Sequence, residues 1–274
     1  MSFRVRELTP AFGAEIEGID LGRNVDDETI NALRRVFDDR GVLVFRGLDL
    51  GADDHARLAG LLVHGEPVVY RHHMSNRELE EYATHGSLLY HADMMWADAP
   101  MELLSLYGLE VEQPSVPTVY VSATHAWDTL SDPLRARVAD LHAVHVTGQQ
   151  MRRGNADELL PVAHEQERSA TKPVALRHPR TGRTILYVSQ MMTSHIEGLA
   201  PDESEALLDE LFAHLYAPEN AWQQDWHDGD LVVWDNLAVQ HARPPVALDG
   251  PARVLRKVIA PAPQLAVTRP TTTG

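Results

Sequence analysis

Short apolar segments separated by turns make up the C-terminal part of this 274-residue chain. We expect strands over residues 221–226, 231–234, 239–241 and 253–259. Turns are predicted between them at Asp228-Gly229-Asp230 and Asp249-Gly250-Pro251, because Gly, Asp and Pro favour turn backbone. Many short strands joined by such turns, together with a few helices, are typical of a double-sheet jelly roll.

The rest of the chain contains further strands and most of the helices. Strands are expected over residues 3–8, 42–45, 101–109, 118–122 and 141–146, with a hairpin over residues 173–188. Helices are expected over residues 28–39, 53–62, 123–130, 133–140 and 202–216. Predicted caps are Asp26 or Asp27, Asp53 or Asp54, Asp202, and Gly41 at the end of the first helix. The fold class is therefore mainly β with flanking helices, a cupin-like double-stranded β-helix.

We expect one jelly-roll domain over residues 1–260 and a loose tail, rich in Pro and Thr, over residues 261–274. Two polar stretches without a clear period interrupt the domain, at about residues 65–90 and 147–172. Long loops inside a compact domain are often functional, so both are predicted to be lids. For the first stretch, the alternative is a disordered surface excursion without a function.

Composition excludes several classes of function. The net charge of −16 disfavours a nucleic-acid partner, because phosphate repels an acidic protein. The absence of cysteine excludes disulfides, zinc-thiolate sites, iron–sulfur clusters and a thiol nucleophile. No apolar run approaches the roughly 18 residues of a membrane span, and the N-terminus lacks the apolar run of a signal peptide. A cytoplasmic protein with a small-molecule substrate is expected, and a homo-oligomer is left open.

A candidate metal site begins at Tyr90-His91-Ala92-Asp93. On extended backbone His91 and Asp93 point to the same side, so an imidazole nitrogen and a carboxylate oxygen can reach one ion. His241 is the candidate third ligand, on a later predicted strand. Two His and one carboxylate leave positions of an octahedral metal open for small molecules.

The last predicted strand carries three basic residues. Arg253 and Lys257 are four apart and share a face, whereas Arg256 points to the other face. An arginine grips a carboxylate with two hydrogen bonds, so an inward Arg253 beside a metal suggests a dicarboxylate bound at both ends. Pairing of Arg253 with a surface Asp or Glu is the alternative, and Arg256 is the next candidate anchor.

Several motifs resemble the taurine / 2,4-dichlorophenoxyacetate dioxygenase family, whose members depend on iron(II) and 2-oxoglutarate. The resemblance extends over about residues 5–260. The most specific motif is Trp234-Asp235-Asn236 followed four residues on by Gln240-His241. The others are Thr9 to Leu21, His91-Ala92-Asp93, Trp127 to Pro133, and His178-Pro179 with Gly182, Tyr187 and Val188.

The resemblance implies an oxygenase that uses Fe(II), 2-oxoglutarate and O2. His91, Asp93 and His241 would hold the iron, and Arg253 with the Thr118 hydroxyl would hold the distal carboxylate of 2-oxoglutarate. The reaction would oxidise a substrate C–H bond and release succinate and CO2. Asn236 and Gln240 are expected to support the ligands, although Asn236 is also a candidate turn cap.

The substrate pocket departs from the pattern of the taurine-oxidising members. Positions that hold sulfonate there correspond to Tyr70 and Lys257, which makes taurine a poor candidate. The remaining predicted pocket residues are apolar, although each Met is equally suited to the core. We therefore expect a compact, mostly apolar substrate that bears a carboxylate, such as a secondary-metabolite intermediate of terpenoid type. Lys257 or Arg71 would contact its carboxylate. The apolar residues are Met94, Met95, Trp96, Met191 and Met192.

Other outcomes are left open. The same site suits desaturation, ring closure or ring expansion, and the substrate class could be an aryloxyalkanoate or an alkyl sulfate ester. A jelly-roll binding protein without catalysis is disfavoured by the intact triad and Arg253. A zinc hydrolase would need a general base near His91, for which Glu102 and Glu110 are the candidates.

Overall fold

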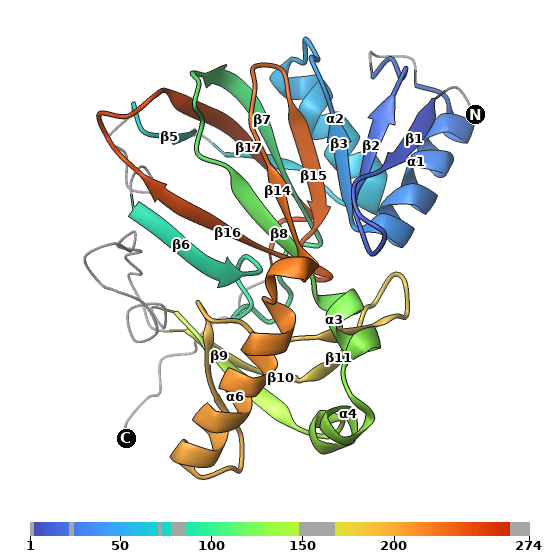
Figure 1. Ribbon diagram of the computed structural model, residues 1–274. Coiled ribbons are helices and arrows are strands. Elements are labelled where there is room, and N and C mark those ends of the chain that lie inside the picture. The colour runs from blue at the N-terminus through green and yellow to red at the C-terminus, as the bar shows by residue number, and fades with distance from the viewer. Residues whose placement is uncertain (1–2, 22–24, 71–72, 78–85, 148–167, 264–274) are drawn as a thin grey trace, which may run out of the picture.

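The computed structural model describes residues 3–21, 25–70, 73–77, 86–147 and 168–263. Two stacked sheets form its centre (Figure 1). In spatial order the large sheet contains β1 (Arg4–Glu7), β2 (Ala14–Glu17), β3 (Val42–Phe45), β15 (Leu231–Asp235), β7 (Leu103–Val111), β17 (Arg253–Ala260) and β4 (Val68–Val69), and β5 (Met74–Ser75) also pairs with β17. The second sheet contains β14 (Ala221–Gln224), β8 (Thr118–Ser122), β16 (Val239–Val246) and β6 (Gly86–His91).

Alternation along the strands of the large sheet creates two separate apolar layers. Leu43 and Phe45 pack against α1 (Asp27–Arg40) and α2 (Ala52–Val63). Val42 and Val44 instead belong to a cluster that includes Tyr120 and other residues of the second sheet. Successive side chains point to opposite faces of a strand, so each strand serves both layers.

A third apolar layer lies in a lobe below the two sheets in Figure 1. Its cluster joins the outer face of the second sheet to helices and small sheets, with α6 as its most apolar helix. The elements of this lobe are α3 (Ala123–Thr129), α4 (Asp132–Val138), β9 (His142–Val146), β10 (Ser169–Pro173), β11 (Ala175–Arg177), β12 (Thr184–Leu186), β13 (Thr193–Ile196), α6 (Pro201–Leu215) and the 3₁₀ turn η1 (Pro218–Asn220).

The predicted jelly roll, the helices and the hairpin of β11 and β12 are present, but the loop prediction over residues 65–88 was wrong. β4, β5 and the start of β6 lie within it and pair with β17 and β16. A strand of two residues is too short to show an alternating pattern in the sequence. Such strands form because the partner strand supplies their hydrogen bonds. Residues 71–72 and 78–85 of the first predicted lid lie outside the described part of the chain. The same holds for residues 148–167, which are most of the second predicted lid, and for the tail beyond residue 263.

Other boundaries also differ from the sequence predictions. Asp26 caps α1 and Gly41 ends it, as expected. The N-cap of α2 is Gly51 and that of α6 is Ala200, not the aspartates predicted there. Acidic residues are favoured throughout a first helical turn, so composition does not identify the cap itself. β13 was not predicted. β16 extends to Val246, beyond the predicted end, with one register shift between His241 and Arg243 and a second between Arg243 and Val246, where its two prolines lie.

No helix in the described ranges is both long and apolar enough to cross a membrane.

Candidate metal centre and cosubstrate site

The predicted metal ligands meet where β6 ends beside β16. His241 is the register partner of His91, and Asp93 follows two residues after the end of β6. Asp93 Oδ1 lies 3.1 Å from His91 Nε2 and 3.8 Å from His241 Nε2. One ligand atom from each residue lies within 4.8 Å of the others, and the three side chains are largely buried. The triad is therefore suited to binding one iron ion.

Hydrogen bonds prepare the donor atoms of the triad. His91 Nδ1 lies 2.7 Å from the Leu89 carbonyl, so Nδ1 carries the proton and the Nε2 lone pair faces Asp93 Oδ1. Two acceptor atoms facing each other at 3.1 Å are stabilised by a cation between them. Burial, and then His91, hold the pKa of His241 well below its usual value, which keeps that imidazole neutral and able to ligate. These features fit a divalent metal.

Asp93 is a carboxylate in this environment. Burial alone raises its pKa, but the charge of Lys257 and the His91 contact lower the pKa to well below the ordinary value. Lys257 Nζ donates a hydrogen bond of 2.6 Å to Asp93 Oδ2 and lies 4.9 Å from the centre of the Tyr70 ring. The two carboxylate oxygens thus face different groups, Oδ1 the imidazoles and Oδ2 the ammonium.

Asn236 holds the backbone of Asp93 from both sides. Its Oδ1 accepts a hydrogen bond from the Asp93 amide at 2.8 Å, and its Nδ2 donates to the carbonyls of Asp93 and Met101. Asn236 is fully buried. Gln240, the other predicted support, faces away from the triad toward Tyr216 and the Val188 carbonyl.

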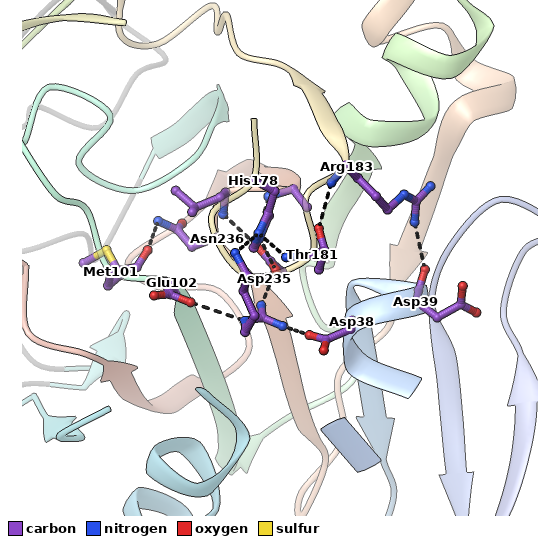
Figure 2. A network of polar contacts seen from close by, with 12 residues as sticks. Asp38, Asp39, Met101, Glu102, His178, Thr181, Arg183, Asp235 and Asn236 are labelled. Carbon is purple, nitrogen blue, oxygen red and sulfur yellow. Dashed lines mark hydrogen bonds and ion pairs between the residues drawn. The ribbon is translucent and has the colours of Figure 1, made fainter. Parts of the chain in front are cut away.

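A buried ionic network surrounds the turn that carries Asn236 (Figure 2). Asp235 Oδ2 lies 2.8 Å from His178 Nε2 and accepts a 2.6 Å hydrogen bond from Arg180, while Oδ1 accepts from two amides of the turn. Arg180 also pairs with Glu102 and with Asp38 of α1. The network thus ties the β11–β12 hairpin to the large sheet directly beside the triad.

The predicted cosubstrate residues lie together between the two sheets. Arg253 Nη2 donates to Thr118 Oγ1 at 3.1 Å, and its Nε donates to the Val116 carbonyl at 3.0 Å. Burial and the nearby Arg243 lower the pKa of Arg253 to about 9. Within the described residues no carboxylate pairs with Arg253, so the surface-acid alternative has no support there.

Arg256 lies on the opposite face of β17, as strand alternation predicts. Its Nη2 donates to the carbonyls of Leu50 and Gly51, and its guanidinium lies 4.6 Å from the Tyr107 ring centre. It is committed to the interface with α2 and does not point toward the triad.

The predicted substrate residues surround the triad at different depths. Lys257 contacts Asp93, and the Tyr70 ring lies beside Lys257. Met94 is half-buried and has a left-handed backbone with φ of 58°. Met94 packs at the border of two apolar clusters. Met95, Trp96 and Met192 lie inside the third layer, and Met95 has no exposed surface. Their contact with substrate stays a prediction. Arg71 lies outside the described residues.

Neither acid predicted for a zinc hydrolase has the environment of a general base at the metal. The Glu102 carboxylate pairs with Arg180, and Glu110 is exposed.

Sequence reasoning missed two buried residues of the inter-sheet space. Arg243 is two residues after His241, and Tyr120 is two residues after Thr118. Strand alternation from Thr118 would have found Tyr120, whereas the register of β16 shifts between His241 and Arg243.

The jelly roll and its triad of two His and one carboxylate define a non-haem iron oxygenase of the 2-oxoglutarate-dependent class. The profile described as "Taurine catabolism dioxygenase TauD, TfdA family" matches residues 4–259, and the chain belongs to this family. It is an enzyme that depends on Fe(II), 2-oxoglutarate and O2.

Relatives and solved structures agree with this assignment. The chain is 28% identical to the alpha-ketoglutarate-dependent 2,4-dichlorophenoxyacetate dioxygenase of Cupriavidus pinatubonensis, over 88% of this chain and 92% of the relative. It is 28% identical to pentalenolactone F synthase of Streptomyces avermitilis, over 91% of this chain and 90% of the relative. A 107-residue alignment with the enzyme of the same name from Streptomyces arenae is 44% identical and covers 38% of this chain and 34% of that relative. A structure described as a putative alpha-ketoglutarate-dependent taurine dioxygenase from Burkholderia xenovorans superimposes with a TM-score of 0.77 at 25% identity. The match covers 96% of this chain and 94% of that chain.

Proposed function

We propose that this enzyme oxidises an unactivated C–H bond of a compact, mostly apolar substrate that carries a carboxylate, such as a terpenoid-type secondary-metabolite intermediate. The observation that carries the proposal is the composition around the triad, where the cation Lys257 contacts Asp93 beside apolar side chains. Similarity to pentalenolactone F synthases over most of the chain supports the same substrate class.

In this proposal His91, Asp93 and His241 hold the iron. Bound iron with 2-oxoglutarate and O2 supplies the oxidant for the C–H bond, with release of succinate and CO2. Arg253 and Thr118 hold the distal carboxylate of 2-oxoglutarate, and so orient the keto-acid end toward the triad. The apolar layer, with Met94 at its edge, excludes water from the reacting carbon.

Lys257 and Tyr70 form the polar end of the proposed substrate pocket. Burial lowers the pKa of Lys257, but Asp93 and then Tyr70 raise it above the ordinary value, so the ammonium stays charged. A substrate carboxylate near Nζ would meet this charge, while the Tyr70 ring covers its other side. An ammonium is a less directional anchor than a guanidinium, which suits substrates of varied shape.

Aryloxyalkanoates are the second candidate substrates, because they also combine an apolar body with a carboxylate, and the Cupriavidus relative carries one in its name. Alkyl sulfates also combine an apolar body with an oxyanion that Lys257 could meet. Taurine ranks lower, since it lacks an apolar body and the positions that hold sulfonate in taurine-oxidising members are Tyr70 and Lys257 here. Desaturation and ring expansion use the same contacts and differ only in the product.

A substrate panel tests the proposal. The enzyme is loaded anaerobically with Fe(II) and 2-oxoglutarate, and the weak visible charge-transfer band of the iron–keto-acid chelate is recorded. Air is then admitted with terpenoid acids, aryloxyalkanoates, alkyl sulfates or taurine, and succinate and products are measured by mass spectrometry. We expect product from the apolar acids. Turnover of small hydrophilic sulfonates or amino acids alone would overturn the substrate class, and binding without succinate would favour a non-catalytic protein.

We also propose that residues 1–260 act as one domain, that the enzyme works in the cytoplasm, and that it needs no nucleic-acid or membrane partner. The net charge of −16 supports the last point for nucleic acid. Cell fractionation tests the location, and analytical ultracentrifugation measures whether the chain forms the homo-oligomer left open by the sequence.

A further inference from the structure

Tyr120 has a buried hydroxyl without a hydrogen-bond partner. The residue has no exposed surface, and its Oη finds no partner in the described part of the chain. Leaving a buried hydroxyl unpaired is unfavourable, so such groups generally mark a site for a water, ion or ligand. The ring itself is firmly held, 5.2 Å from Trp234 and 5.7 Å from Trp222 between ring centres.

Strand geometry places this hydroxyl in the candidate cosubstrate site. Thr118 and Tyr120 are two apart on β8 and share its inner face, the face that Arg253 contacts through Thr118 Oγ1. Burial raises the pKa of Tyr120, and the Arg253 charge and the Thr118 hydroxyl lower it in part. The same ring lies 6.3 Å from His241, nearly parallel to it.

Hydrogen-bond donors outnumber acceptors around this point. Thr118 Oγ1 already accepts from Arg253 and from Trp226 Nε1, so both of its lone pairs are used and it cannot accept the Tyr120 proton as well. Within the described residues no carboxylate pairs with the buried Arg253, and Arg243, two residues after His241, adds a second positive charge near it. Buried donors and positive charges that share one space are complementary to a carboxylate.

We propose that Tyr120 is a further 2-oxoglutarate-binding residue, whose hydroxyl donates to the distal carboxylate held by Arg253 and Thr118. This inference rests on the proposed roles of Arg253 and Thr118. Because the Tyr120 ring also stacks near His241, the residue links the cosubstrate's distal end to the metal centre.

Substitution Tyr120→Phe tests the proposal by removing only the oxygen. The Mn(II)-loaded enzyme is titrated calorimetrically with 2-oxoglutarate and with 2-oxovalerate, in which a methyl group replaces the distal carboxylate. We expect the Kd for 2-oxoglutarate to rise about tenfold or more, since hydrogen bonds to charged groups are among the strong ones. The Kd for 2-oxovalerate should change less than about twofold.

The matched control is Tyr107→Phe, which removes a buried tyrosine hydroxyl on the far side of β7, where it donates to the Leu48 carbonyl. It should leave both dissociation constants unchanged. Without ligand, Tyr120→Phe should be at least as thermally stable as the wild type, because it removes an unpaired buried polar group.

Three outcomes would overturn the inference. The first is unchanged 2-oxoglutarate affinity in Tyr120→Phe. The second is equal weakening of both keto acids, which would indicate a structural role. The third is loss of stability without ligand, which would mean that the hydroxyl is already bonded in the empty enzyme. A wild-type enzyme that binds no 2-oxoglutarate would instead overturn the proposed function, and this inference with it.

Discussion

Arg253 and Arg256 are three residues apart on β17 and face opposite layers. Arg253 contacts Thr118 in the space between the sheets, and Arg256 contacts carbonyls at the start of α2. We predict that Arg253→Leu raises the 2-oxoglutarate Kd roughly 30-fold or more, because truncating a buried charge leaves the ligand carboxylate unpaired. The measurement is calorimetric titration of the Mn(II)-loaded enzyme.

Arg256→Leu is the control for this prediction. It should leave the 2-oxoglutarate Kd within about twofold while lowering the melting temperature, because the carbonyls of Leu50 and Gly51 lose their donor. The opposite result, with affinity lost in the Arg256 variant and retained in the Arg253 variant, would exchange the roles of the two residues.

Asn236 acts on the metal through the backbone of Asp93. We predict that Asn236→Ala weakens Mn(II) or Co(II) binding about 10- to 100-fold, the usual effect of removing a group that orients a ligand. The reason is that the Asp93 amide and carbonyl both lose their partner. Metal titration of the enzyme without 2-oxoglutarate gives the affinity directly.

Asn220→Ala is a control, because the Asn220 side chain donates to the His214 carbonyl near the end of α6 and not to the backbone of a metal ligand. An Asn236→Ala enzyme with wild-type metal affinity would mean that Asp93 is held by its side-chain contacts alone.

Helix α2 is attached to the large sheet through a histidine that is neutral when folded. Arg256 Nε donates to His55 Nδ1, and His55 Nε2 lies 2.7 Å from Ser105 Oγ. Burial, and then Arg256, lower the pKa of His55 to about 3. In the unfolded chain the pKa is about 6.5, so between these values the unfolded state binds more protons. Folding stability is therefore present above about pH 6.5 and is lost as the pH falls toward 3.

We predict that His55→Gln flattens this dependence. Glutamine can accept from Arg256 and donate to Ser105 without titrating, which removes up to about 1.4 kcal/mol per pH unit from the slope. Urea unfolding at several pH values between about 4 and 7 measures the difference. His195→Gln, at an exposed position, should keep the wild-type slope. An unchanged slope in His55→Gln would show that other groups cause the loss of stability at low pH. His145 is then the first candidate, because burial also lowers its pKa to about 3.

The Asp235 network joins parts of the molecule that are far apart in sequence. It links β15, the hairpin of β11 and β12, and Asp38 of α1 (Figure 2). We predict that Asp235→Ala lowers the free energy of unfolding by about 3–5 kcal/mol, because His178 and Arg180 lose their buried carboxylate. Denaturant unfolding measures the loss.

Exposed ion pairs should behave differently. Arg137→Ala breaks the exposed pair with Glu210 and should cost less than about 1 kcal/mol. Similar small losses for both variants would mean that the buried network contributes little net stability.

Across the whole chain, the sequence alone determined what depends on local order. Alternation places Arg253 and Lys257 on a common face of β17, and Asp26 and Gly41 delimit α1 through local hydrogen bonds and backbone conformation. The sequence also paired His91 with Asp93, although Asp93 lies in the turn after β6 and not on the extended backbone that was expected. The specific motif around Trp234 to His241 identified the family.

Tertiary structure decided what depends on partners distant in sequence. β4 and β5 exist only because β17 provides their hydrogen bonds, and Asn236 supports a ligand 143 residues away. Likewise Tyr120 looks in the sequence like an ordinary buried aromatic residue. Only the packing of β8 against β16 and β17 surrounds its hydroxyl with Thr118 and Arg253 and leaves it unpaired among the residues that the structure describes. A buried polar group's need for a partner is set by its neighbours in space.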